Sequence, residues 1–154
     1  DLHARYDLAM TAAREAGQVA KRVFDSTFEV EWKEDQSPVT VADRDAERHI
    51  RNLVAAKFPD DGVVGEEYGA TPTASGFKWI IDPIDGTKSF VRGVPLWGTL
   101  VGLEYKGEQV AGAVAVPCLG QLFHAVRGGG AYRDGSRIRV SDVADLSQAH
   151  MCYS

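Results

Sequence analysis

Apolar residues recur at helical spacing in two stretches near the start of the chain. The first stretch covers about residues 3 to 24, and its stripe consists of Leu8, Ala12, Ala16, Val19, Ala20, Val23 and Phe24. The second stretch opens with Thr40 as a candidate N-cap, with Asp43 three residues later. Its stripe consists of Ala46, Ile50, Leu53 and Val54 and stops at Phe58-Pro59. The pattern predicts two amphipathic helices, with Asp43 in the first turn of the second.

Short apolar runs that are typical of strands follow the second helix. An apolar pair leads into the glutamates of VVGEEYG, and the next stretch, GATPTASG, predicts a loop. Candidate strands then cover residues 78–81, 95–105, 109–117 and 121–127. The Asp-Gly pair in YRDGSRIRV predicts a hairpin. Helices followed by strands without regular alternation favour an α+β fold, a layered sandwich, over a doubly wound sheet.

Composition is that of an ordinary globular protein. Of 154 residues, 44% are hydrophobic and 25% are charged, enough for one globular domain or for part of a larger one. No apolar run approaches the roughly 18 residues of a membrane span, and no signal segment leads the chain, so we expect a cytoplasmic protein with no membrane contact. The formal charge of -5, without a basic patch, argues against a nucleic-acid partner.

The cysteines and histidines offer no obvious metal site. Cys118 and Cys152 are far apart and lack the spacing of a zinc site, so we expect reduced structural thiols. Four scattered histidines are expected to be surface or packing residues: His3, His49, His124 and His150. The chain also lacks the motifs of a P-loop, a dinucleotide-binding loop, a zinc protease and a serine hydrolase.

The stretch WIIDPIDGTKSF, residues 79–90, carries the most specific chemistry. Asp82 and Asp85 stand three apart across a proline at the end of an apolar run. Because proline fixes φ, the stretch can form a rigid turn that aims both carboxylates at one point, with a main-chain carbonyl between them as a further ligand for Mg2+. Gly86 allows close backbone approach, Thr87 adds a hydroxyl, and a helix opening at GTKSF would offer free N–H groups to an anion.

Two further observations bear on this stretch. The GEE sequence at residues 65–67 also follows an apolar pair, so Glu66 or Glu67 could reach the same cation from a neighbouring strand end. A solvated Asx turn and a solvated glutamate pair are the ordinary alternatives. A covalent phosphatase of the haloacid-dehalogenase class needs D-x-D-G-T, and the D-x-x-D-G-T found here contains one residue too many.

The order of these motifs resembles the inositol-monophosphatase family of magnesium-dependent phosphomonoesterases. SPVTVADRDAE, GEE, WIIDPIDGT, FVRGVP and GGGAYRDGSRIRVS follow in the family's order over essentially the whole chain. The stretch DPIDGTKSFVRGVPLWGTL is most similar to the histidinol-phosphate phosphatase branch. The resemblance implies a sugar-phosphatase type of α+β sandwich, in which two N-terminal helices pack on a mainly antiparallel sheet.

The resemblance also implies roles for individual carboxylates. Glu66 would bind metal and orient the attacking water, and Asp82 would bridge metals. The main-chain carbonyl of Ile84 would complete one site, and Asp85 would hold the second metal. Asp43 would lie near a more weakly held third metal.

The remaining roles concern phosphate and the surroundings of the metals. Gly86 and Thr87 match the family's phosphate-binding backbone, and the Thr87 hydroxyl would assist the water. Glu67 would contact the metal ligands without binding the metal itself. No nucleophilic side chain is required, since Mg2+ can activate the water.

The family continues beyond the point where this chain ends. We therefore expect residues 1–154 to be the N-terminal metal- and phosphate-binding domain, without the family's C-terminal domain and its further metal aspartate. Histidinol-phosphatase activity is the expected function. An inositol monophosphatase or broad sugar-phosphate phosphatase and a catalytically silent metal-binding fragment stay open as alternatives. Family likeness suggests a homodimer acting on a small phosphorylated metabolite.

Overall fold

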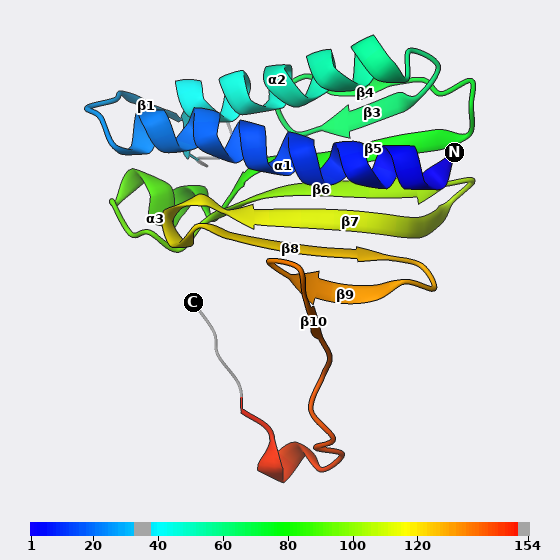
Figure 1. Ribbon diagram of the computed structural model, residues 1–154. Helices are drawn as coiled ribbons and strands as arrows, with labels where there is room; N and C mark the ends of the chain where they lie inside the picture. Colours follow the sequence, from blue (N-terminus) through cyan, green and yellow to red (C-terminus); the bar gives the residue numbers. More distant parts are fainter. Residues whose placement is uncertain (33–37, 151–154) are drawn as a thin grey trace.

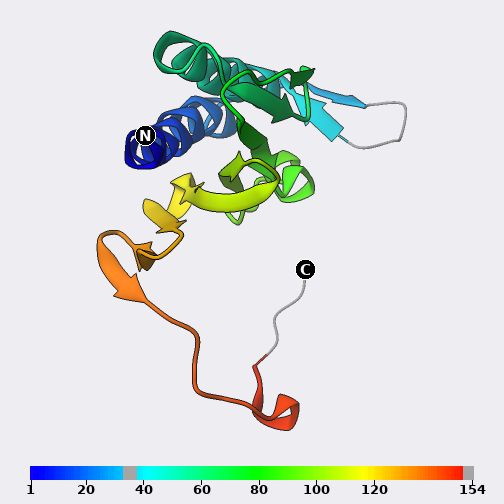
Figure 2. The same cartoon turned by 90° about the vertical axis from the view of Figure 1, so that its right-hand side faces the viewer.

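Two long helices cover one face of a sheet in the computed structural model, which describes residues 1–32 and 38–150. Helix α1 spans Leu2–Phe24 and α2 spans Val41–Lys57, so both predicted helices are confirmed. Figures 1 and 2 show them side by side on the same side of the sheet. No helix of the described residues is long and apolar enough to cross a membrane.

The sheet has eight strands in the order β10-β9-β8-β7-β6-β5-β3-β4. Their bounds are Gly62–Gly65 for β3, Gly69–Thr71 for β4, Phe77–Asp85 for β5, Gly98–Tyr105 for β6, Glu108–Val116 for β7, Gln121–Val126 for β8, Gly130–Arg133 for β9 and Ser136–Ile138 for β10. Every neighbouring pair is antiparallel except β3 and β5, which are parallel. The α+β fold with a mainly antiparallel sheet is confirmed, and so is the Asp134-Gly135 hairpin turn.

The predicted rigid turn at Asp82–Asp85 is wrong, because β5 continues through it. Asp82 pairs with Leu100 and Asp85 with Gly98, so β5 holds one residue more than β6 over this interval. Such an extra residue is a β-bulge, which lets the strand pass proline although proline cannot donate to the ladder. Thr99 Oγ1 donates to the Pro83 carbonyl at 2.8 Å and secures the bulge from the neighbouring strand.

Three short strands were not expected from the sequence. Gly69–Thr71, at the start of the predicted loop, forms edge strand β4 on β3. A separate two-stranded sheet joins β1, Val30–Trp32, to β2, Pro38–Thr40. The described residues also form three short helices: α3 at Thr87–Val91, η1 at Pro117–Leu119 and η2 at Leu146–Gln148.

The core lies between the helices and the sheet. The buried side of α1, which is packed against α2 and the sheet, includes five fully buried alanines: Ala9, Ala12, Ala13, Ala16 and Ala20. Small side chains allow neighbouring elements to approach closely, and the strands contribute larger residues, among them Trp79 and Leu103, which are also fully buried. The helices and strands thereby form one core cluster.

A buried ion pair ties the start of α1 to β5. Arg5 donates to both oxygens of Asp61 at 2.7 Å, and Trp79 Nε1 and Ser75 Oγ donate to the same carboxylate at 2.9 and 2.6 Å. The guanidinium of Arg5 also lies about 4 Å from the ring centroids of Phe58 and Phe77. This network locates the helix relative to the strand that carries the candidate site.

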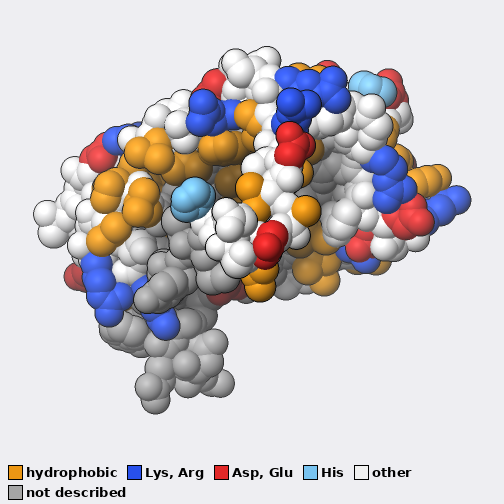
Figure 3. All heavy atoms as spheres, turned by 90° about the horizontal axis from the view of Figure 1, so that it is seen from below, with side chains coloured by type: hydrophobic (Ala, Val, Ile, Leu, Met, Phe, Trp, Pro, Cys, Tyr) orange, Lys and Arg blue, Asp and Glu red, His pale blue; other side chains and the backbone are white. Residues whose placement is uncertain are grey.

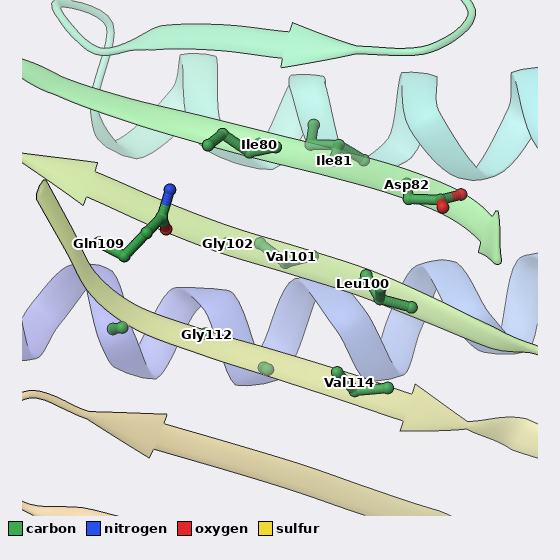
Figure 4. Close-up of a pocket in the computed structure, with 11 residues that line it drawn as sticks. Ile80, Ile81, Asp82, Leu100, Val101, Gly102, Gln109, Gly112 and Val114 are labelled. Carbon is green, nitrogen blue, oxygen red and sulfur yellow. The ribbon is translucent and has the colours of Figure 1, made fainter. Parts of the chain in front are cut away.

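The opposite face of the sheet is not covered by any described helix. A groove of about 360 Å³ runs along it, lined by side chains and backbone of Ile80, Asp82, Leu100, Gly102, Gln109 and Val114 (Figure 4). Further apolar positions lie on β8 and β9 near the same face, and Figure 3 shows hydrophobic side chains gathered on the surface seen from below. Residues 139–150 run away from the sheet (Figures 1 and 2).

Candidate metal centre

The parallel pairing of β3 and β5 brings two acidic strand ends together. Gly65, the last residue of β3, is opposite Ile81 of β5. Glu66 follows Gly65 and Asp82 follows Ile81, so both carboxylates lie at the same edge of the sheet. The glutamate pair therefore follows the end of a neighbouring strand, as expected, and its contact with a cation stays a prediction. Figure 4 shows Asp82 at this end of β5, beyond Ile80 and Ile81.

Asp82 is the centre of this acidic edge. Its Oδ1 atom is buried and has no hydrogen-bond partner among the described residues. The pKa of Asp82 is raised to about 6, chiefly by burial and further by the negative charges of Asp85, Glu66 and Asp43. A hydrogen bond from the Ile84 N–H acts in the other direction and lowers it. A half-buried carboxylate among like charges favours the binding of a cation.

Asp43 reaches the same edge from the start of α2. The Thr40 N–H and Oγ1 both donate to Asp43 Oδ2 at 2.8 Å, and Ala42 N–H donates to Thr40 Oγ1 at 3.1 Å. This is the predicted capping box, and it fixes the Asp43 side chain in a buried position. Burial raises the pKa of Asp43 despite the Thr40 hydrogen bonds, and the charge of Glu67 raises it further.

The end of β5 and the start of α3 contribute the other predicted residues. Asp85 is exposed, and Gly86 is the N-cap of α3 with a left-handed φ of 90° that favours glycine. Thr87 Oγ1 donates to the Ile84 carbonyl at 2.9 Å. A predicted metal-ligating carbonyl and a predicted water-orienting hydroxyl are thus hydrogen-bonded to each other. The expected helix at GTKSF is confirmed as one of five residues.

These residues fit a divalent cation as donors, although they do not form a closed coordination shell. Within residues 1–32 and 38–150, no three Asp, Glu, His or Cys side chains are gathered tightly enough to hold a metal. The unpartnered Asp82 oxygen and the mutual repulsion of the carboxylates nevertheless create a strongly negative edge. Carboxylate and carbonyl oxygens are the ligands that Mg2+ prefers, and Mg2+ retains waters beside a few protein ligands.

Two supporting residues escaped the sequence analysis. Glu47 is fully buried and accepts hydrogen bonds from the turn that carries Glu66, and Thr99 holds the bulge of β5. A signal for Glu47 was present, because Asp43, Glu47 and Ile50 are spaced three and four apart and share one face of α2. A charged residue on the buried face of a helix needs a partner.

The described histidines and Cys118 make contacts of other kinds. Tyr6 Oη is hydrogen-bonded to His124 Nδ1, and the His124 ring stacks on Tyr132. His49 Nε2 contacts a carboxylate oxygen of Glu15 at 2.8 Å, and the other two described histidines, His3 and His150, are exposed. Cys118 is a partly buried free thiol, as expected, while Cys152 lies outside the described residues.

Comparison with known proteins gives a consistent family. The family model described as "Inositol monophosphatase family" matches residues 1–154. A histidinol-phosphatase from Chlorobaculum parvum is 45% identical and one from Mycobacterium tuberculosis 41% identical, each over 96% of this chain. A fructose-1,6-bisphosphatase/inositol-1-monophosphatase from Aquifex aeolicus is 38% identical, also over 96% of the chain.

The match covers little more than half of each relative. The chain spans 57%, 59% and 56% of the lengths of these three proteins. Among solved structures, the extragenic suppressor protein suhB from Bartonella henselae superimposes with a TM-score of 0.87 at 34% identity. That likeness covers 91% of this chain and 55% of the suhB chain.

Proposed function

Because the chain belongs to the inositol monophosphatase family, we propose that it forms the metal- and phosphate-binding part of a Mg2+-dependent phosphomonoesterase. Histidinol phosphate is the proposed substrate, with release of histidinol and phosphate. The observation that carries the proposal is the buried Asp82 oxygen, which has no partner among the described residues and lies among like charges at the end of β5. The two histidinol-phosphatases at 45% and 41% identity support the substrate.

Each acidic residue contributes in a different way. Asp82, Asp85 and Glu66 would hold the cations, with Asp43 near a weaker position and the Ile84 carbonyl as a neutral ligand. When bound, Mg2+ neutralises phosphate charge and lowers the pKa of a bound water. Glu66 would orient the attacking water, and no side chain has to form a covalent bond to phosphorus.

The start of α3 would receive the phosphate. Gly86 is exposed and has no side chain, so an anion would be able to approach the backbone of this turn, and Gly86 and Thr87 are the proposed phosphate-binding residues. The Thr87 hydroxyl donates to the Ile84 carbonyl and so fixes the end of β5 relative to the helix. The phosphate would then bind beside the cations where β5 is followed by α3. Glu67 would contact the metal ligands without binding the metal itself.

Phosphate release tests this function directly. Histidinol phosphate and inositol 1-phosphate are assayed with Mg2+ and with a chelator, using the 154-residue chain and any longer gene product that contains it. We expect release from histidinol phosphate only with Mg2+, and none from Asp85→Asn, which removes a ligand charge and keeps the side-chain shape. Release without Mg2+, or wild-type turnover by Asp85→Asn, would contradict the metal assignment.

A second substrate class is favoured by one specific observation. The relative from Aquifex aeolicus, which is 38% identical over 96% of this chain, is named as both a fructose-1,6-bisphosphatase and an inositol-1-monophosphatase. Faster release from inositol 1-phosphate or from a sugar bisphosphate than from histidinol phosphate would move the assignment to this class. Mg2+ binding without turnover by any form of the protein would instead support a silent metal-binding module.

The setting of the enzyme belongs to the same proposal. We place it in the cytoplasm, in histidine biosynthesis, as a homodimer acting on a small phosphorylated metabolite and contacting neither nucleic acid nor membrane. Sedimentation of the purified protein at several concentrations tests the dimer.

A further inference from the structure

Glu47 is a fully buried carboxylate that binds the turn carrying Glu66. Its Oε2 accepts from the Glu67 N–H at 2.7 Å, and its Oε1 accepts from the Tyr68 N–H at 3.2 Å. Arg51 Nε donates to Oε1 at 2.8 Å, one helical turn further along α2. Two main-chain amides and a guanidinium thereby satisfy a charge that has no exposed surface.

Gly65 makes this contact possible. A Cβ atom at Gly65 would lie 2.2 Å from Glu47 Oε1 and 2.4 Å from its Cδ. No side chain other than hydrogen fits there unless the carboxylate moves away from the turn. Glycine at the end of β3 therefore leaves room for the Glu47 carboxylate. The turn that carries Glu66 begins directly after it.

Arg51 binds the C-terminal end of the same turn. Its Nη2 donates to the Gly69 carbonyl, and its guanidinium lies 6.0 Å from the centroid of the Tyr68 ring. The N–H groups of residues 67 and 68 and the carbonyl of residue 69 are thus all bound to side chains of α2. The turn is held by the helix as well as by the pairing of β3 with β4.

We infer that Glu47 is a positioning residue for the metal centre, an inference that rests on the proposed function. Asp43 and Glu47 lie one turn apart on α2 and are both buried. Asp43 is placed at the acidic edge directly, whereas Glu47 acts through the backbone of the turn that presents Glu66. One rigid helix therefore sets the distance of Asp43 and of the Glu66 turn from Asp82 on β5.

Glu47→Gln tests the inference, because the amide keeps the size of the side chain but cannot accept hydrogen bonds at both ends. Mg2+ alone is the probe, titrated calorimetrically into the chain, and hydrogen exchange is followed at the amides of residues 67 and 68. We expect the Mg2+ dissociation constant to rise about 10- to 100-fold and exchange at these amides to accelerate. In active protein, the Mg2+ activation constant should rise while KM at saturating Mg2+ stays unchanged.

Two further variants make the result specific. Asp45→Asn removes a charge from the same helix but contacts Arg48 rather than the turn, so it should bind Mg2+ as the wild type does. Arg51→Lys keeps a positive charge beside Glu47, loses the paired hydrogen bonds of the guanidinium, and should weaken Mg2+ binding less than Glu47→Gln does. If Glu47→Gln fails to fold, Arg51→Lys is compared with the wild type: weaker Mg2+ binding with faster exchange at residues 67 and 68 supports the inference, and wild-type Mg2+ binding overturns it.

The outcomes separate the inference from the function on which it rests. Accelerated exchange at residues 67 and 68 together with wild-type Mg2+ affinity would overturn the positioning role and leave Glu47 as a stabilising residue. Wild-type exchange in Glu47→Gln would overturn the inference as well. A wild-type chain that binds no Mg2+ would overturn the proposed function itself, whatever the variants do.

Discussion

Asp82 makes the stability of the metal-free protein depend on pH in an unusual direction. Burial and neighbouring carboxylates raise its pKa from 3.8 to about 6. The folded state therefore binds a proton more tightly than the unfolded state, and this stabilisation is fully present below about pH 4 and lost as pH rises through 6. In chelator, urea unfolding should show that Asp82→Asn is less sensitive than wild type to a change from pH 5 to pH 7.5.

Mg2+ provides the control for this expectation. Added at pH 7.5, it should restore stability to the wild type and have little effect on Asp82→Asn. Equal pH dependence of the two proteins between pH 5 and 7.5 would mean that Asp82 does not carry the raised pKa.

Asp61 is a stabilising carboxylate outside the candidate metal centre. It accepts hydrogen bonds from Arg5, Ser75 and Trp79, and its side chain is completely buried. Asp61→Asn leaves Arg5 with an uncompensated charge, so we expect a loss of about 3–5 kcal/mol in the free energy of unfolding, measured with urea. Glu108→Gln, which breaks the exposed pair with Arg127, is the matched control and should cost less than about 1 kcal/mol. Similar losses would show that burial does not set the difference.

At the scale of elements, the helices and the Asp-Gly hairpin were predictable because local patterns specify them. The stripe on α1, the capping box of α2 and the turn at Asp134-Gly135 each need only neighbouring residues. The extension of β5 through Pro83 was not predictable, since a proline favours a turn and the bulge depends on Thr99 from another strand. Strand β4 forms by pairing with β3, a partner that the local pattern of residues 69–71 does not reveal.

The candidate site divides in the same way. Asp82, Asp85, Glu66 and Asp43 were named as candidates because specific motifs carry them, and the approach of Glu66 to Asp82 depends on the parallel pairing of β3 with β5. Glu47 belongs to no such motif, and its role depends on amides twenty residues later in the chain.

The cap of α2 allows one prediction at this scale. Thr40 is fully buried, and it both caps the helix and donates to Asp43. Thr40→Ala should lower the free energy of unfolding by about 0.5–2 kcal/mol, because the Ala42 N–H in the first turn of α2 loses its acceptor. Thr40→Ser keeps the hydroxyl and should retain most of the stability. Equal urea midpoints for the two variants would show that the hydroxyl is not the stabilising group.

At the scale of the molecule, the helices of the described residues leave one face of the sheet uncovered, and the groove on this face is lined mainly by apolar residues. Ile80 is 37% exposed beside the groove on this face. Contiguous exposed apolar surface mediates association. The chain should therefore bind the dye ANS and sediment as larger species at high concentration, and Ile80→Lys should reduce both. Leu96→Lys, at an exposed leucine that does not line the groove, is the control. Unchanged dye binding in Ile80→Lys would mean that the groove is not the association surface.

Asp82 contributes to two features of the molecule. It is the centre of the acidic edge, and it also lines the groove on the uncovered face of the sheet. A polypeptide packed into that groove would exclude water from the carboxylate and so alter its affinity for a cation. Thermodynamic linkage is reciprocal, so a cation on Asp82 must alter the affinity for that polypeptide by the same factor. Packing of a polypeptide into the groove and binding of a cation at Asp82 would then be two sides of a single equilibrium.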